Sequence, residues 1–162
     1  MSLTDLASVS TIAQAVLVII SLGFIWHQLR QGTKLAKAAN SQAIAEQALS
    51  FNSLLIEHSD VADLWYSYGK GFPSADKTNE HRYRELLVQW LILHENIYYQ
   101  WEKGLLDPEI HTSWLEDLKH TVRKHNLKVI SDDLRQFFPG NFGDHIIKLR
   151  DMSLTASSSN DA

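Results

Sequence analysis

Residues 6–26 read LASVSTIAQAVLVIISLGFIW, and this stretch decides the fold. It contains no charged residue and no proline, so nothing within it opposes a continuous helix. At about 1.5 Å of rise per residue, such a helix reaches roughly 31 Å, which is enough to cross the hydrocarbon core of a bilayer. We therefore predict a transmembrane helix here. A buried helix of a soluble protein is the alternative, because five polar residues dilute the apolar run.

The charges that flank this stretch predict its orientation. The one charged side chain before it is acidic, Asp5, whereas the first three after it are basic: Arg30, Lys34 and Lys37. The positive-inside rule places the basic flank in the cytoplasm. We expect residues 1–5 to lie outside the bacterial inner membrane and the C-terminal part to be cytoplasmic. Because a basic start and a small-residue cleavage site are missing, we do not expect a cleaved signal peptide.

Small and polar side chains share one side of the predicted transmembrane helix. They are Ala7, Ser10, Gln14, Leu17 and Ser21, which fall within or beside a narrow arc at about 100° per residue. Within lipid, small residues let two backbones approach and amides form hydrogen bonds across an interface. We predict that this stripe contacts a second copy of the chain or the span of another membrane protein. Hydrogen bonding of these side chains to their own backbone, or a small homo-oligomeric channel, are the alternatives.

The composition limits the remaining classes. A formal net charge of −4 over 162 residues gives no general attraction to nucleic acid, and no recognition motif is present, so we expect no nucleic-acid partner. The absence of cysteine excludes disulfides and thiol chemistry. Three prolines and seven glycines leave few breaks, which favours long helices. We predict an all-α protein with one modest cytoplasmic domain.

The transmembrane helix is expected to run on through a connecting helix over residues 27–58, with Gly32 as the one breaker. The buried face of its second half is marked by apolar residues at helical spacing: Ile44, Ala48, Phe51 and Leu55. A helical bundle over residues 59–151 is predicted to pack on residues 40–58. The tail, residues 152–162, has too little apolar surface to become ordered.

Start and stop signals divide the predicted bundle into five helices. Gly104 follows a long, nearly all-apolar helix as a left-handed cap, and Asp107-Pro108 combines a cap residue with proline at the first helical position. The predicted ranges are 61–68, 78–103, 108–125, a short helix capped by residues 131–133 and ending at 138, and 141–151.

Three short segments resemble a known family. They are residues 28–33 (QLRQGT), 95–100 (ENIYYQ) and 104–107 (GLLD), followed by Trp114. Up to about Phe142, the chain is similar to a widespread bacterial family of small single-pass membrane proteins with a helical cytoplasmic domain of unknown function. The resemblance implies a topology and no particular activity.

The predicted central helix carries a polar group made of His94, Glu95, Tyr98 and Tyr99. His94-Glu95 begins like a zinc-protease helix, but Tyr98 stands where the second histidine is required. Because an unpaired buried charge is costly, we expect His94 and Glu95 to be a core polar pair with hydrogen-bond partners. A pocket with Tyr98 or Tyr99 is the alternative.

Asp117 and His120 have the carboxylate-x-x-His spacing of metal sites in helical bundles. Such a site needs matching ligands on facing helices, and the central helix offers only Glu95 and Glu102. We therefore predict no metal and no cofactor, and a solvated helix face instead.

The one basic cluster consists of Lys119, Arg123, Lys124 and Lys128. It falls at a predicted helix C-terminus, where the helix dipole favours cations. Anionic lipid headgroups, or an acidic partner, are the alternatives.

Aromatic residues gather in the middle of the chain, and a small domain is not expected to bury them all. They are Trp65, Tyr66, Tyr68, Tyr83, Trp90, Tyr98, Tyr99, Trp101 and Trp114. We expect one exposed aromatic patch, which would serve partner binding.

The sequence contains no Gly-rich phosphate loop, no nucleophile elbow and no thiol, so enzymatic activity is not favoured. We predict a membrane-anchored helical protein that acts through protein contact, as an oligomeric scaffold, accessory subunit or regulator. A membrane-tethered enzyme or ligand sensor with a polar site in the bundle, and a small channel, are the alternatives.

Overall fold

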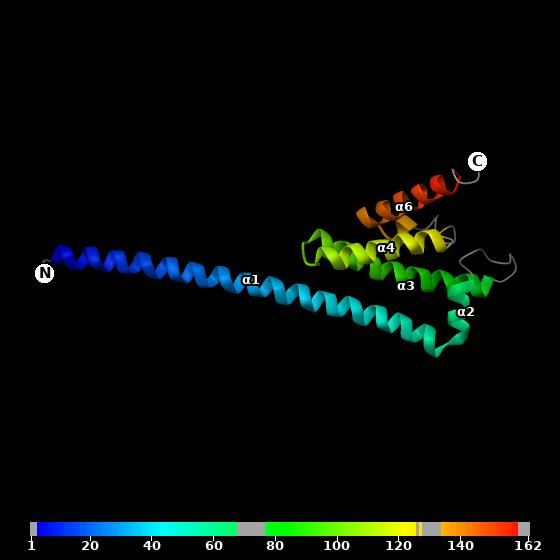
Figure 1. The fold of residues 1–162 in the computed structure, drawn as a ribbon, viewed down its shortest axis with the longest axis horizontal. Coiled ribbons are helices and arrows are strands. Elements are labelled where there is room, and N and C mark those ends of the chain that lie inside the picture. Colours follow the sequence, from blue (N-terminus) through cyan, green and yellow to red (C-terminus); the bar gives the residue numbers. More distant parts are fainter. Residues whose placement is uncertain (1–2, 68–76, 126, 128–133, 159–162) are drawn as a thin grey trace. The chain divides into compact units, whose positions relative to one another are not determined.

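The computed structural model describes residues 3–67, 77–125, 127 and 134–158 (Figure 1). All regular structure in these residues is helical and none is strand, which confirms the predicted all-α class. The helices are α1 (Leu3–Glu57), α2 (Ser59–Ser67), α3 (Lys77–Glu102), α4 (Pro108–Lys124), α5 (Leu134–Phe137) and α6 (Asn141–Ser158). The chain divides into two compact units, Met1–Ala39 and Asn40–Ala162.

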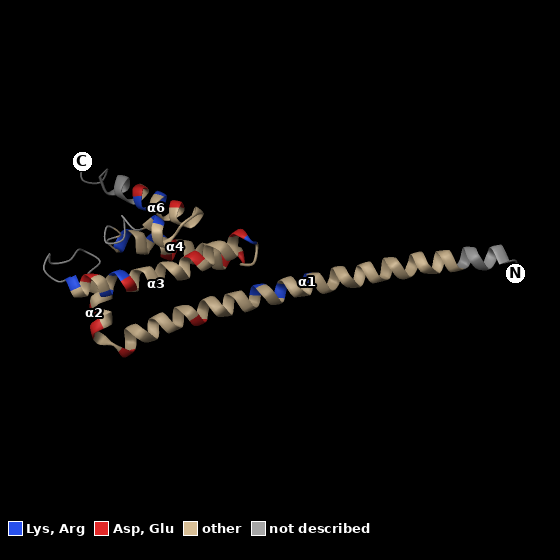
Figure 2. Ribbon diagram, turned by 180° about the vertical axis from the view of Figure 1, so that it is seen from behind, with Lys and Arg blue, Asp and Glu red and all other residues tan. Residues whose placement is uncertain are grey.

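Helix α1 is 55 residues long and passes through Gly32 without interruption. One glycine costs a helix only about 1 kcal/mol relative to alanine, so good helix formers on both sides carry the helix across it. Before Arg30, the described side chains of α1 include no Lys, Arg, Asp or Glu (Figure 2). Among the described helices, α1 is the one long and apolar enough to cross a membrane, and its apolar window is not buried.

The second unit has a core to which the end of α1 contributes. Ile44, Phe51 and Leu55 are buried and Ala48 is half-buried, as their spacing predicts. The Phe51 ring contacts Trp65 of α2 at a centroid distance of 5.1 Å and Trp90 of α3 at 4.8 Å. The apolar stripe of α1 therefore packs against both α2 and α3.

Helix α3 contributes more buried side chains than any other described helix. The buried residues of α3 are Tyr83, Leu86, Leu87, Val88, Leu91, Leu93, His94 and Ile97. It packs against α2 and α4, while α6 packs against α4 and α5. This distribution follows from a helix whose middle is apolar on nearly every side.

Local signals set the ends of α3 and α4 as predicted. Gly104 has a φ of 69°, the left-handed conformation that glycine adopts without steric cost, and its N–H donates to the Trp101 carbonyl at 2.8 Å. Helix α4 begins at Pro108 after Asp107, whose backbone carbonyl accepts from the His111 N–H at 3.0 Å. The Asp107 side chain makes no cap hydrogen bond.

Amide hydrogen bonds tie the start of the second unit to the end of α3. The Asn40 Nδ2 group donates to Gln100 Oε1 at 2.8 Å and to the Leu105 carbonyl at 3.3 Å. Asn40 is half-buried, so these bonds satisfy an amide that is partly removed from water.

Two predicted helix boundaries differ from the structure by two residues or more. Helix α2 begins at Ser59 and not at Val61, because the His58 carbonyl already accepts from the Val61 and Ala62 N–H groups. Helix α6 continues to Ser158, so its expected end near residue 151, and the unordered tail from 152, are wrong as far as Ser158. Once a helix is packed, each further residue adds a hydrogen bond at little cost. The expected caps at 131–133 and the last tail residues, 159–162, lie outside the described residues.

Gly143 permits a close contact at the start of α6. A Cβ atom at this position would overlap the backbone carbonyl oxygen of Phe138. Phe138 and Phe142 are both buried, with ring centroids 5.6 Å apart in an edge-to-face arrangement. The missing side chain therefore lets the turn before α6 lie directly on the helix.

Candidate functional site

The predicted interface stripe of α1 lies on an exposed helix surface. Ser10, Gln14, Leu17 and Ser21 are all exposed, and the side chain of Ala7 lies outside the described residues. The Ser21 hydroxyl donates to the Leu17 carbonyl at 2.8 Å, so its hydrogen bond is made within the helix. The Gln14 amide makes no hydrogen bond to a described residue.

The stripe belongs to a longer apolar surface. Large apolar side chains are exposed all round this part of α1: Ile12, Val16, Leu17, Val18, Ile19, Ile20, Leu22, Phe24, Ile25, Trp26 and Leu29. Near the end of this surface, the Arg30 guanidinium lies 5.6 Å from the Trp26 ring centroid. An amphipathic ring beside a cation is typical of the boundary between hydrocarbon and headgroups.

His94 is paired across helices and not with its neighbour. The imidazole is 2% exposed, and its Nε2 atom lies 3.1 Å from Asp117 Oδ2 of α4. His94 therefore has the hydrogen-bond partner that was expected for it, and this partner lies on the facing helix. Glu95 is half-buried and makes no hydrogen bond to a described residue, and burial raises the pKa of its carboxyl. Its partial exposure lets water take the place of the expected partner.

The two tyrosines of the predicted polar group also have different surroundings. Tyr98 donates its hydroxyl hydrogen to Glu102 Oε1 at 3.0 Å. Burial, and then the Glu102 carboxylate, raise the pKa of the Tyr98 phenol. Tyr99 packs on the core, with its hydroxyl beside Gly140. Of the predicted group, His94 and Tyr98 line one cavity, while Glu95 and Tyr99 do not.

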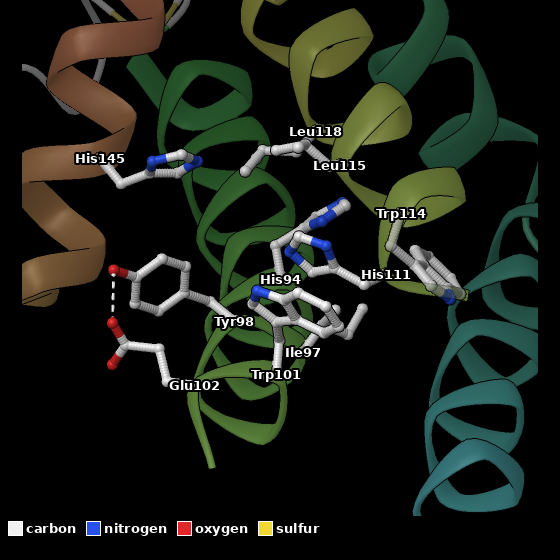
Figure 3. Close-up of a pocket in the computed structure, with 10 residues that line it drawn as sticks. All are labelled: His94, Ile97, Tyr98, Trp101, Glu102, His111, Trp114, Leu115, Leu118 and His145. Atoms are coloured by element: carbon white, nitrogen blue, oxygen red, sulfur yellow. Dashed lines mark hydrogen bonds between the residues drawn. The ribbon is translucent and has the colours of Figure 1, made fainter. Parts of the chain in front are cut away.

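This cavity lies in the second unit, has a volume of about 230 Å³, and is partly open to solvent. Figure 3 shows the side chains that line it. Helices α3, α4 and α6 supply its walls. The lining residues are His94, Ile97, Tyr98, Trp101, Glu102, His111, Trp114, Leu115, Leu118 and His145. They include one carboxylate, and neither lysine nor arginine.

Burial governs the charge of two histidines in the lining. It lowers the pKa of His111, and the neighbouring His145 lowers it further. The pKa of His145 is also lowered, first by burial and then by Lys148 and Lys119. A histidine with a lowered pKa is uncharged at neutral pH, so these two rings behave as polar aromatic walls.

The spacing of Asp117 and His120 does not create a metal site among the described residues. No three histidine or acidic side chains gather there as ligands would. Asp117 instead lies beside His94 of the facing helix.

The basic cluster lies largely in the last turns of α4, as predicted, with Arg123 and Lys124 in the final turn. Its charges have partners nearby. Lys119 Nζ lies 2.6 Å from Glu116 Oε1, and Lys124 Nζ lies 5.1 Å from the ring centroid of Tyr66. Lys128 lies outside the described residues.

The expected single aromatic patch is not formed by the described residues. Of the nine aromatic residues, Tyr66 and Trp101 are exposed, Tyr68 is not described, and the rest are buried or half-buried. Tyr66 follows Trp65, which contacts Tyr83 near the start of α3, whereas Trp101 stands at the end of α3. The two exposed rings therefore belong to opposite ends of this helix.

Sequence reasoning missed Trp101, His111 and His145 as cavity residues. His94, Tyr98 and Trp101 recur at helical spacing on α3, and His111, Leu115 and Leu118 recur in the same way on α4. This matched periodicity was the available signal. The approach of His145 depends on how α6 packs on α4, which no local pattern fixes.

Comparison with protein-family models, with curated proteins and with solved structures gives no match to this chain. The resemblance of its short segments to a bacterial membrane-protein family therefore stays a prediction.

Proposed function

We propose that this chain is a membrane-anchored helical protein that acts through contact with other proteins, as an oligomeric scaffold, accessory subunit or regulator. Residues 6–26 would cross the bacterial inner membrane with the N-terminus outside. The second unit would form a helical bundle in the cytoplasm. The observation that carries this proposal is the exposed apolar surface of α1 from Ile12 to Leu29, a stretch without Asp, Glu, Lys or Arg. In water this surface would be strongly unfavourable, whereas hydrocarbon accommodates it.

Gln14 supports contact between membrane helices. Its amide is exposed on α1 and makes no hydrogen bond to a described residue. In hydrocarbon, an amide without a partner costs several kcal/mol, and a hydrogen bond across an interface recovers part of that cost. Ser10 and Ser21, on the same side, are small enough to let a second helix approach. The internal hydrogen bond of Ser21 leaves that small volume unchanged.

Cysteine cross-linking in native membranes tests this proposal, and the chain provides a background without cysteine. We expect Leu17→Cys and Ser21→Cys to form cross-linked products under mild oxidation. Ile12→Cys and Ile19→Cys lie about 180° away on the same helix and serve as matched controls that stay monomeric. A cross-linked product of twice the mass of the chain identifies a homodimer. A product of any other mass identifies a different membrane protein as the partner.

Equal cross-linking on both faces, or none at any position, would contradict contact through the stripe. The anchor itself is tested separately. After ultracentrifugation without detergent, we expect the full-length protein in the membrane pellet. A reporter fused after Ala162 should be active only in the cytoplasm. Protein that remains in the supernatant, or a reporter active only in the periplasm, would overturn the anchor or its orientation.

A further inference from the structure

The cavity of the second unit is enclosed largely by aromatic rings. The His111 ring lies nearly parallel to the Trp101 indole at a centroid distance of 4.2 Å. In Figure 3, this stack stands on one side of the cavity and the Tyr98 ring stands on the other, with His145 of α6 above it. Aromatic faces carry the negative part of the ring quadrupole, which attracts cations.

The charge of the cavity also favours a cation. Glu102 is the one carboxylate in the lining, and neither lysine nor arginine is present among the lining residues. Its Oε1 atom accepts the Tyr98 hydroxyl hydrogen, while its Oε2 atom has no hydrogen bond to a described residue. Glu102 is also the last residue of α3, where the helix dipole adds partial negative charge.

The neighbouring basic groups do not cancel this preference. His111 and His145 are uncharged at neutral pH, because burial lowers the pKa of both. The two lysines that act on His145 do not line the cavity. Lys119 is paired with Glu116, and Lys148 is exposed on α6.

We propose that this cavity binds a small organic cation with a methylated ammonium group, held between Tyr98 and the Trp101–His111 stack beside the Glu102 carboxylate. Its volume of about 230 Å³ suits such a group with a short chain. Sites for drug-sized ligands are larger, roughly 300–1,000 Å³. The inference does not depend on the proposed membrane role, because every residue in it belongs to the second unit.

Choline and its uncharged isostere 3,3-dimethylbutan-1-ol test the requirement for charge. The full-length protein in maltoside micelles is titrated with each compound, with binding followed by calorimetry and by the NMR signal of the Trp101 indole N–H. We expect choline to bind at least about tenfold more tightly, since only the ammonium ion gains cation–π attraction and the field of Glu102. Equal affinities, or no binding of choline, would overturn the proposal.

Variants locate the site. Glu102→Gln keeps the side-chain shape but removes the charge, and Trp101→Leu keeps apolar volume but removes the ring. We expect each to weaken choline binding about five- to thirtyfold. Glu57→Gln on α1, which does not line the cavity, is the charge control and should bind choline within about threefold of the parent protein. Wild-type affinity in Glu102→Gln would contradict the assignment even if Trp101→Leu does not fold.

The same ammonium group occurs in free metabolites and in lipid headgroups, and the membrane composition distinguishes them. In nanodiscs of phosphatidylglycerol, added choline should shift the Trp101 signal. If the natural source is a choline headgroup, nanodiscs of phosphatidylcholine should give that shift without added choline. If the source is soluble, the signal in both membranes should be the same until choline is added. A Trp101 signal that no ammonium compound moves in either membrane would overturn the proposal.

Discussion

The two units of this chain use apolar residues in opposite ways. In the first, Phe24 is 62% exposed and most of the helix surface around it is apolar. In the second, Phe142 is 0% exposed and lies among Phe138, Tyr98 and other core residues. A phenylalanine therefore stabilises the folded core in the second unit, whereas in the first unit it makes the helix surface apolar. Hydrophobicity acquires its structural meaning from what surrounds it.

Truncation of one phenylalanine in each unit gives the largest expected contrast. Phe142→Ala should lower the free energy of unfolding of the second unit by about 3–5 kcal/mol, because it leaves a cavity in a packed core. Phe24→Ala should leave that free energy unchanged, because no core residue surrounds Phe24. Urea titration of the full-length protein in detergent, followed by tryptophan fluorescence, measures both. Equal effects of the two substitutions would remove the distinction between the units.

An arginine introduced into each unit should affect membrane insertion only in the first unit. Ile19→Arg should disfavour membrane insertion by about 2.5–3.5 kcal/mol, because an arginine at the centre of a transmembrane helix is poorly solvated. Ile92→Arg on α3 should leave insertion unchanged, since this side chain is 53% exposed on the second unit. The fraction of protein in alkali-washed membranes measures the effect. Full membrane retention of Ile19→Arg would contradict a transmembrane role of this segment.

Acid should act on the second unit through His125. This imidazole is buried, its ring centroid lies 4.1 Å from that of Trp65, and its Nδ1 atom lies 2.7 Å from the Tyr83 hydroxyl oxygen. Burial, followed by Lys124 and His120, lowers the pKa of His125 to about 4. The unfolded chain, with an ordinary pKa of about 6.5, binds more protons between these values. Stability is therefore complete above the unfolded pKa and falls as the pH decreases towards 4.

Between pH 7 and pH 5, we expect His125 to account for a loss of about 2 kcal/mol in the free energy of unfolding. His111 and His145, whose pKa values are also lowered, act in the same direction. His125→Gln should show a smaller loss over this range, whereas membrane retention should not change with pH. An identical pH dependence in parent and variant would show that His125 does not contribute to acid sensitivity.

Local signals predicted most of the helices, and tertiary pairing was the part they missed. The glycine at 104, the proline at 108 and the apolar spacing from Ile44 to Leu55 each act within one helix or turn, so the sequence displays them directly. The partner of His94 lies 23 residues away, and its position depends on the register between α3 and α4. Sequence reasoning therefore named both His94 and Asp117, but it left the partner of His94 open and placed Asp117 on a solvated helix face.

The hydrogen bonds of Asn40 have a practical consequence. The amide joins the first residue of the second unit to the end of α3, and the buried stripe of α1 starts four residues later, at Ile44. A shortened chain that starts at residue 40 keeps the Asn40 hydrogen bonds and the buried stripe. It lacks the exposed apolar surface of the first unit. We expect this fragment to fold in water without detergent, which would make it the natural sample for crystallisation.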